Sequence, residues 1–232
     1  MSNQTLSSEV LTELCSFSTC VVASSIEKFD IRLRNLGFAD SHVRCMYPDF
    51  PPVAGFAATA RIRSATPPME GGGYYDRTDW WDHILSIPGP RIVVLEDVDS
   101  PPGLGAFIGE VHANILRALG CAAVITNGAV RDLPEVREAG LQLFAGNVSV
   151  SHAYAHVFEF GHTVQVGQLR ITPGNLLHGD LHGVHQIPLQ IADQIPGMAR
   201  EILEKRRRVV ELCRSGEFNR HKLQAVIKNE HA

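Results

Sequence analysis

The sequence predicts an α/β fold with helices at both ends of the chain. Apolar strands alternate with amphipathic helices between about residues 55 and 144, and the pattern changes to β from about residue 157. Helical spacing of apolar residues marks residues 7–28 and 189–213. With 232 residues, the chain suits one large domain or two small ones.

Each predicted element rests on its own residue pattern. Strands follow from apolar runs or alternation and are expected over residues 55–63, 91–96, 121–126, 141–144, 163–166, 169–171 and 183–188. Helices follow from apolar spacing and cap residues and are expected over residues 7–16, about 20–28, 79–86, 106–119 (a turn plus helix), 134–140 and 189–213. A kink is expected at Pro196, and residues 216–232 should form a polar, poorly packed tail.

The helix after residue 106 carries the clearest expectation about the core. Its apolar residues at positions i, i+4, i+7 and i+8 predict one buried face, made by Val111, Ile115, Ala118 and Leu119. Gly120 follows as a C′ glycine that ends this helix. Pro134 should open the next helix as its first residue.

The composition is that of an ordinary globular protein. The hydrophobic content is 44%, the charged content is 20% and the net charge is −4, so no basic footprint for nucleic acid is present. The basic run at residues 205–208 lies in a helical pattern and is interpreted as a solvated face. No apolar run approaches the roughly 20 residues of a membrane span, and no secretory signal is visible. We therefore expect a cytoplasmic protein that does not enter a membrane.

Two turns hold the candidate chemistry. Residues 105–112 (GAFIGEVH) read as a glycine-rich turn running into a helix, and residues 127–132 (NGAVRD) read as a turn after a strand. Twenty residues separate Glu110 from Arg131, which gives the pattern acid-x20-Arg-Asp. A strand–turn–helix–strand–turn unit of this length can bring both turns to one sheet edge.

Taken singly, the three charged residues have simple structural explanations. Asp132 suits a helix cap, Arg131 suits a surface ion pair, and Glu110 suits the first turn of a helix. Together they indicate a site, because a carboxylate at a turn is a hard ligand for Mg²⁺ or Mn²⁺ and an arginine can hold a carboxylate or enolate oxygen. The backbone N–H groups of residues 109–112 could receive the other oxygens of a substrate.

The eleven histidines raise a different possibility. The segment from Gly167 through Pro173 and Gly174 to His178 partly resembles the second cupin motif, and this alternative predicts histidine-ligated metal at His178 and His182. The sequence has no His-x-His, which that site needs. Structural or surface roles are therefore favoured for this set, which comprises His152, His156, His178, His182 and His185.

The segment at residues 64–76 is the least regular internal stretch, with two prolines and a Gly71-Gly72-Gly73 run. It is interpreted either as a mobile surface loop or as a lid over a site. Because such loops build the distal part of a pocket, the identity of the substrate is not readable from this sequence.

Three ordered motifs carry a resemblance to a known family. Residues 109–113 (GEVHA), 127–132 (NGAVRD) and 166–184 (VGQLRITPGNLLHGDLHGV) resemble the RraA-like family over about residues 50–190. That family includes class II 4-hydroxy-4-methyl-2-oxoglutarate aldolases with oxaloacetate decarboxylase activity, and regulators of ribonuclease E activity. The resemblance implies a single-domain β/β/α swivelling fold over residues 1–215, assembled as a homotrimer or hexamer.

The resemblance also implies roles for individual residues. Arg131 would bind the substrate and Asp132 would hold Mg²⁺ or Mn²⁺, largely through waters. Gly109, Glu110, Val111 and His112 would bind pyruvate through their backbone N–H groups, and Glu110 would position a water that carries a proton. The expected activity is a metal-dependent carbon–carbon lyase acting on a small 2-oxo acid. The alternative is a non-catalytic regulator that binds a ribonuclease.

This sequence departs from the family pattern at three places. Glu110 stands where the aldolases have aspartate, and Asn127-Gly128 replaces the frequent Asp-Gly turn. The family's C-terminal acid, supplied across a subunit interface, has three candidates here: Glu201, Glu204 and Glu211. Because the ribonuclease regulators lack the acid-x20-Arg-Asp set, its modified presence favours a lyase.

Overall fold

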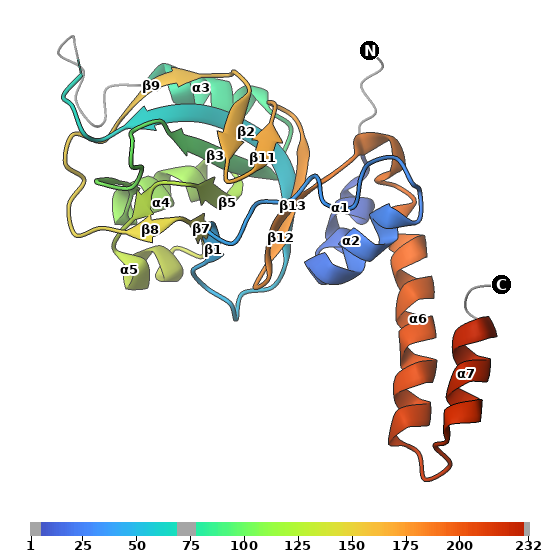
Figure 1. Cartoon of the computed structure of the whole chain (residues 1–232). Helices are drawn as coiled ribbons and strands as arrows, with labels where there is room; N and C mark the ends of the chain where they lie inside the picture. The colour runs from blue at the N-terminus through green and yellow to red at the C-terminus, as the bar shows by residue number, and fades with distance from the viewer. Residues whose placement is uncertain (1–5, 69–77, 230–232) are drawn as a thin grey trace.

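The computed structural model describes residues 6–68 and 78–229. Figure 1 shows a β-rich body with α1 (Ser8–Leu14) and α2 (Thr19–Glu27) at one side and a long helix, α6 (Ile195–Arg214), that extends away from it. A last helix, α7 (Arg220–Asn229), returns alongside α6. The single domain combines a mixed sheet with helices at both chain ends, as the sequence predicts.

The main sheet has eight strands in the order β1-β7-β5-β3-β2-β12-β13, with β9 pairing the other end of β2. Its strands are β1 (Arg44–Cys45), β2 (Val53–Arg63), β3 (Arg91–Asp97), β5 (Cys121–Thr126), β7 (Gln142–Ala145), β9 (His156–Phe160), β12 (Leu176–Asp180) and β13 (Gly183–Ile187). The four central strands β2, β3, β5 and β7 are parallel, and β1, β9, β12 and β13 join antiparallel.

Two smaller sheets complete the β structure. The first is parallel and consists of β4 (Ala106–Ile108), β6 (Ala129–Val130) and β8 (Asn147–Val148). The second is a hairpin of β10 (Val164–Val166) and β11 (Leu169–Ile171), whose turn places Gly167 at φ +58°. A positive φ is readily adopted by glycine, which explains this residue at the turn.

The main sheet is buried on both faces, which makes the domain three layers thick. Alternate residues such as Ala58 and Leu95 pack in a large apolar cluster that includes α1, α3 (Thr78–Ser86) and α4 (Glu110–Ala118). The intervening residues, including Ala57 and Val94, pack in a second cluster against the β10–β11 hairpin. Burial on both sides explains why the central strands read as nearly continuous apolar runs.

Most predicted elements are confirmed, and the short helix α5 (Leu133–Glu138) also lies where expected. Four details differ. Pro134 is the second residue of α5, and Pro196 lies in the first turn of α6, where the missing N–H costs nothing, so it produces no kink. The segment Leu189–Ile191 is a separate 3₁₀ turn. The polar tail was not predicted to be helical, yet it forms α7 beside α6.

The core face predicted for α4 was wrong. Residues 106–108 form a strand rather than a turn, and the helix buries His112, Ala113 and Leu116, whereas Val111 is 51% exposed. The face that α4 turns to the core is set at the start of the helix, where the His112 ring stacks on Phe107 with the ring centroids 4.4 Å apart. The expected lid lies mainly at residues 69–77, outside the described residues.

Helices α1 and α2 are attached by buried polar contacts to β12, the strand next to the sheet edge. Thr19 at the start of α2 donates to Asp180 from its backbone nitrogen (2.9 Å) and its hydroxyl (2.6 Å). The Nε2 of His178 lies 3.1 Å from the carbonyl oxygen of Leu14, and its Nδ1 lies 3.2 Å from Nε2 of His185. These bonds satisfy polar groups that would otherwise be costly to bury.

No single helix among the described residues is long and apolar enough to cross a membrane. The two N-terminal helices pass that test only as a pair, and the pair is bent by 111°.

We expect acid to destabilise the protein in part through His178. Burial lowers the pKa of His178 from 6.5 to about 4, so the unfolded chain takes up a proton below pH 6.5 that the folded chain does not accept. Stability should therefore fall as the pH drops from 6.5 towards 4, by about 2 kcal/mol between pH 7 and pH 5 for this residue. Urea denaturation at both pH values measures the effect.

The variant His178→Gln should be less stable at pH 7 and should lose less stability on acidification. The control is His221→Gln on the exposed face of α7, which should keep the wild-type pH dependence. Equal acid sensitivity in the wild type and His178→Gln would contradict this assignment.

Candidate active site

The two turns converge because β4 and β6 are parallel neighbours. Ala106 pairs with Ala129 and Ile108 pairs with Val130, so both strands end at the same edge of the small sheet. The ladder continues for one more bond, in which Arg131 N donates to the Ile108 carbonyl over 2.9 Å. The start of α4 and the Arg-Asp pair therefore lie side by side, as the spacing predicts.

Asp132 joins the two turns. It is the N-cap residue of α5, yet its side chain does not cap that helix. Instead its Oδ2 accepts a hydrogen bond from the backbone nitrogen of Glu110, the first residue of α4, over 3.1 Å. Asp132 has φ +51° and ψ +46°, a left-handed conformation that is uncommon outside glycine. Such backbone strain is found at functional sites, where the surrounding structure enforces it.

The Arg131 guanidinium lies against the same carboxylate. Its Nε is 3.3 Å from Oδ2 of Asp132, but the N–H is not aligned for a hydrogen bond and has no other partner among the described residues. The two side chains are 32% and 35% exposed, so a small ligand can reach them. The ion pair positions Arg131 by charge and leaves hydrogen-bonding capacity on its guanidinium.

Gly109 allows this close approach. A Cβ built on Gly109 would overlap Oδ2 of Asp132 and would lie 3.1 Å from Cγ and Nε of Arg131. The backbone of Gly109 is extended at φ −140°, so the glycine is required by space rather than by conformation. Only a residue without a side chain lets the Asp132 carboxylate reach the start of α4.

The start of α4 offers backbone amides to an anion. Gly109 is the N-cap and provides no side-chain cap, and the N–H of Glu110 is used by Asp132. Val111 and His112 belong to the first turn, whose amides have no acceptor within the helix. Burial lowers the pKa of the His112 ring to about 4, so at neutral pH this histidine adds no positive charge.

Asn127 stabilises the turn that precedes Arg131 and Asp132. Its Oδ1 accepts from Asp97 N over 2.8 Å, and its Nδ2 donates to the Asp97 carbonyl over 2.9 Å, which joins the ends of β3 and β5. An amide can make both bonds, whereas an ionised aspartate could only accept. Asp97 is not singled out by any pattern in the sequence. Its side chain is buried, and its Oδ2 accepts a hydrogen bond from Gly103 N over 2.7 Å. Burial raises the pKa of this carboxyl group.

A model of the RraA-like family, described as Aldolase/RraA, matches residues 19–185. The chain belongs to the RraA-like family. This family includes aldolases and decarboxylases as well as RNase E inhibitors, and the match contains the whole acid-x20-Arg-Asp pattern. Among curated proteins, none matches this chain.

Solved structures share the RraA-like fold at low sequence identity. An uncharacterized protein from Pseudomonas syringae pv. tomato has 18% identity and a TM-score of 0.75, covering 99% of this chain and 97% of its own. A structure described as novel cellulases from gut-associated microbes has 20% identity, a TM-score of 0.75 and 90% coverage of both chains. Streptomyces coelicolor RraAS2, of the RNase ES inhibitor RraA family, has 20% identity, a TM-score of 0.68, and coverages of 88% and 98%.

The backbone nitrogen of Glu110 contacts Asp132, but the Glu110 side chain is exposed to solvent. The side chain is exposed, and no described residue bonds its carboxylate. The three acids considered for a C-terminal contribution are not brought to the site within this chain. They lie on α6, which extends from the side of the body opposite α4 and α5 (Figure 1). Glu204 and Glu211 instead pair with Arg207 on the same helix.

The donor set at the site fits a weakly held, hydrated cation. No group of three or more histidine, cysteine, aspartate or glutamate residues among the described residues could hold a metal directly. The carboxylates of Asp132 and Glu110 are hard oxygen donors of the type that binds Mg²⁺ or Mn²⁺, and Mg²⁺ usually keeps several waters. Asp132 is the better placed of the two because its carboxylate is already held.

The geometry does not support the cupin-like alternative. The Nε2 of His178 is 3.1 Å from the Leu14 carbonyl, and His178 Nδ1 faces His185, so both ring nitrogens have structural partners. His182 Nδ1 lies 3.1 Å from Asp180. These histidines attach the N-terminal helices to β12 and β13, in agreement with the structural role favoured from the sequence.

We expect Gly109→Ala to displace the Asp132 carboxylate and to destabilise the fold. A methyl group here overpacks the contact between the two turns, at a cost of about 1–3 kcal/mol. Thermal unfolding measures the loss.

The matched control is Gly197→Ala in α6, where nothing lies within 4 Å of an added Cβ. That substitution should be neutral or slightly stabilising, because alanine is the better helix former. If both variants unfold at the same temperature, the proposed crowding at Gly109 is wrong.

Proposed function

We propose that this protein is a divalent-metal-dependent lyase that cleaves or decarboxylates a small 2-oxo acid. The observation that carries the proposal is the convergence of the Arg131 guanidinium, the Asp132 carboxylate and the first-turn amides of α4 at one sheet edge. Positive charge and N–H donors suit the vicinal carboxylate and ketone oxygens of such a substrate. Membership of a family that includes lyases supports the same assignment.

The reaction follows from what these groups can stabilise. When the bond to C3 of the substrate breaks, its electron pair moves onto the ketone oxygen and leaves the enolate of pyruvate, with either carbon dioxide or a carbonyl compound as the second product. Arg131 and the α4 amides stabilise the negative charge where it develops. In the aldol cleavage the C4 hydroxyl gives its proton to a water that Glu110 positions, and in both reactions a proton then reaches C3 from that water. A divalent cation held by Asp132 through water would, when bound, polarise the ketone as a Lewis acid.

The assembly we propose is a homotrimer or hexamer. Glu110 is exposed, and among the described residues no group of three or more acidic, histidine or cysteine side chains could hold a metal, so the proposed site needs a further acid. A neighbouring copy could provide it. In this arrangement the substrate-binding surface is completed at the interface between subunits.

The second candidate function is that of a non-catalytic regulator that binds a ribonuclease. The similarity to Streptomyces coelicolor RraAS2, described as an unusual member of the RNase ES inhibitor family, favours this candidate. Glu110 in place of the aldolase aspartate favours it too, because the longer side chain carries its carboxylate away from Asp132. A ribonuclease-inhibition assay on the purified chain distinguishes it from the lyase.

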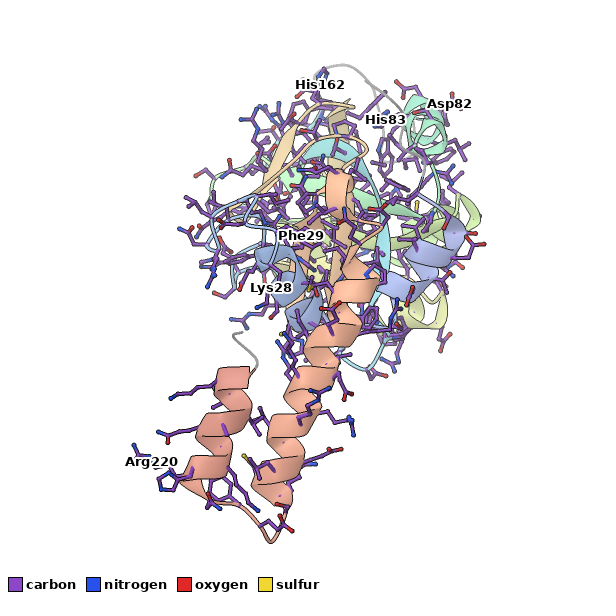
Figure 2. The ribbon with its side chains drawn as sticks, turned by 90° about the vertical axis from the view of Figure 1, so that its right-hand side faces the viewer. Lys28, Phe29, Asp82, His83, His162 and Arg220 are labelled. Atoms are coloured by element: carbon purple, nitrogen blue, oxygen red, sulfur yellow. The ribbon has the colours of Figure 1, made fainter. Side chains whose placement is uncertain are left out.

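The lyase proposal predicts metal-dependent pyruvate release from oxaloacetate or from a 4-hydroxy-2-oxo diacid. Arg131→Ala should lower kcat/KM by about 10²-fold or more, because it removes the charge that stabilises the enolate. Asp132→Ala should raise the concentration of Mg²⁺ needed for half-maximal activity. The control Arg220→Ala, at the far end of the helical hairpin (Figure 2), should behave like the wild type. Full activity in excess chelator would overturn the proposal.

Glu110 can be tested separately. Glu110→Gln keeps the size of the side chain and its backbone bond to Asp132 but removes the charge, so kcat should fall by about 10-fold while folding is retained. Glu110→Asp keeps the carboxylate and should therefore be more active than Glu110→Gln. If Glu110→Gln is as active as the wild type at every pH, this carboxylate takes no part in proton transfer.

A further inference from the structure

A cavity lies against α2, on the side of the body opposite α4 and α5 (Figure 1). It has a volume of about 230 Å³ and lies between α2, residues 31–39 and β13. Its apolar wall is formed by Ala23, Ile26, Leu33, Leu36, Phe38 and Val184. Cavities for drug-sized ligands span about 300–1,000 Å³, so this one suits a smaller molecule.

Two apolar side chains of this wall are unusually open. Leu33 is 69% exposed and Leu36 is 53% exposed. They belong to a segment without helix or strand that crosses in front of β13 and is attached to it by the Ala39–Val184 and Gln186–Gly37 backbone bonds. A ligand body seated here would cover apolar surface that the chain leaves in water.

Arg32 provides a positive charge at this cavity. Its Nη1 donates to the Gln186 carbonyl over 2.8 Å, and Gly37 leaves room for the guanidinium beside it. Among the described residues no carboxylate pairs with Arg32, although burial lowers its pKa. A half-buried cation that lacks an anionic partner is costly, and its remaining N–H donors are suited to a ligand carboxylate.

The surroundings of Arg32 strengthen this charge. Arg34 lines both this cavity and an adjoining groove, about 670 Å³ in volume, between α2 and α6. Lys28, Lys205 and Arg206 line the same groove, and one acid, Glu27, lines both the groove and the cavity. Figure 2 shows Lys28 at the end of α2 that lies next to α6. An anion is therefore favoured at the open side of the cavity.

His185 provides the opposite kind of group, a hydrogen-bond acceptor. His178 Nε2 faces the Leu14 carbonyl and must carry the proton there, so His178 Nδ1 accepts. His185 Nε2 therefore donates to His178 Nδ1, and His185 Nδ1 is left without a proton. This nitrogen is buried and has no hydrogen-bond partner among the described residues, and His185 is one of the residues that line the cavity. A buried acceptor without a donor destabilises the free protein, and a ligand hydroxyl would relieve that cost.

We infer that this cavity binds a small organic monoanion with an apolar body and a hydroxyl group. The carboxylate would pair with Arg32, the body would cover Leu33 and Leu36, and the hydroxyl would donate to His185 Nδ1. The site is distinct from the Arg131 site and does not depend on the proposed lyase activity. Helix α2, which the Thr19–Asp180 bonds attach to β12, forms one wall of it.

Calorimetric titration with two matched probes tests this inference. 4-Hydroxyphenylacetate and phenylacetate differ only in the hydroxyl, so the hydroxylated probe should bind about 5- to 10-fold more tightly. Arg32→Gln should weaken both probes by about 10-fold or more, because it removes the charged partner. Ala23→Leu, which fills the cavity, should block both. The controls Arg220→Gln and Arg131→Ala should leave the affinities unchanged.

The histidine assignment has an independent test. Nitrogen-15 spectra of the imidazole rings should show His178 and His185 both protonated at Nε2, and the Nδ1 signal of His185 should shift when 4-hydroxyphenylacetate is added. The inference is overturned if neither probe binds, if both bind equally, if Arg131→Ala abolishes binding, or if His185 carries its proton on Nδ1. If the wild-type protein binds the probes as expected but shows no lyase activity, only the lyase proposal is overturned.

Discussion

The hydrogen bond from Glu110 N to the Asp132 carboxylate is the contact on which the candidate site depends. It joins the starts of two helices that follow neighbouring parallel strands, and it uses an amide that helix geometry leaves without an internal acceptor. Because Oδ2 is fixed in this way, the Arg131 guanidinium is positioned by charge and stays available to a ligand. The Asp132 carboxylate can come this close to α4 only because residue 109 is glycine, since any side chain there would displace the carboxylate.

The rest of the domain keeps these turns in place by connecting layers. Asn127 bonds the backbone of Asp97 in both directions, so the ends of β3 and β5 cannot separate beneath the small sheet. At the other edge, the Thr19–Asp180 and His178–Leu14 bonds attach the N-terminal helices to β12. The Thr19–Asp180 bonds hold α2 where it lines the cavity beside residues 31–39 and β13. A ligand bound in this cavity would therefore stabilise the packing of α2 on the sheet.

Much of the architecture was predictable from local pattern. Continuous apolar runs identified the central strands, and Gly120 ended α4 as expected, with φ +75°. The failures had two origins, one local and one in pairing between distant segments. The spacing of apolar residues on α4 suggested Val111 as core, yet a histidine stacked on Phe107 set the helix phase, because aromatic burial outweighs the preference of one valine. Short strands such as β4 and β6 exist through partners distant in sequence, which periodicity cannot show.

The sequence by itself determined the fold class, the family and the two charged turns, because these depend on apolar period, glycine placement and the order of motifs along the chain. The tertiary structure alone decided which atoms meet. It showed that Asp132 bonds across to α4 rather than capping its own helix, and that Arg32 lacks a carboxylate among the described residues. Both outcomes depend on approaches between segments far apart in sequence, and such distances are set only when the layers pack.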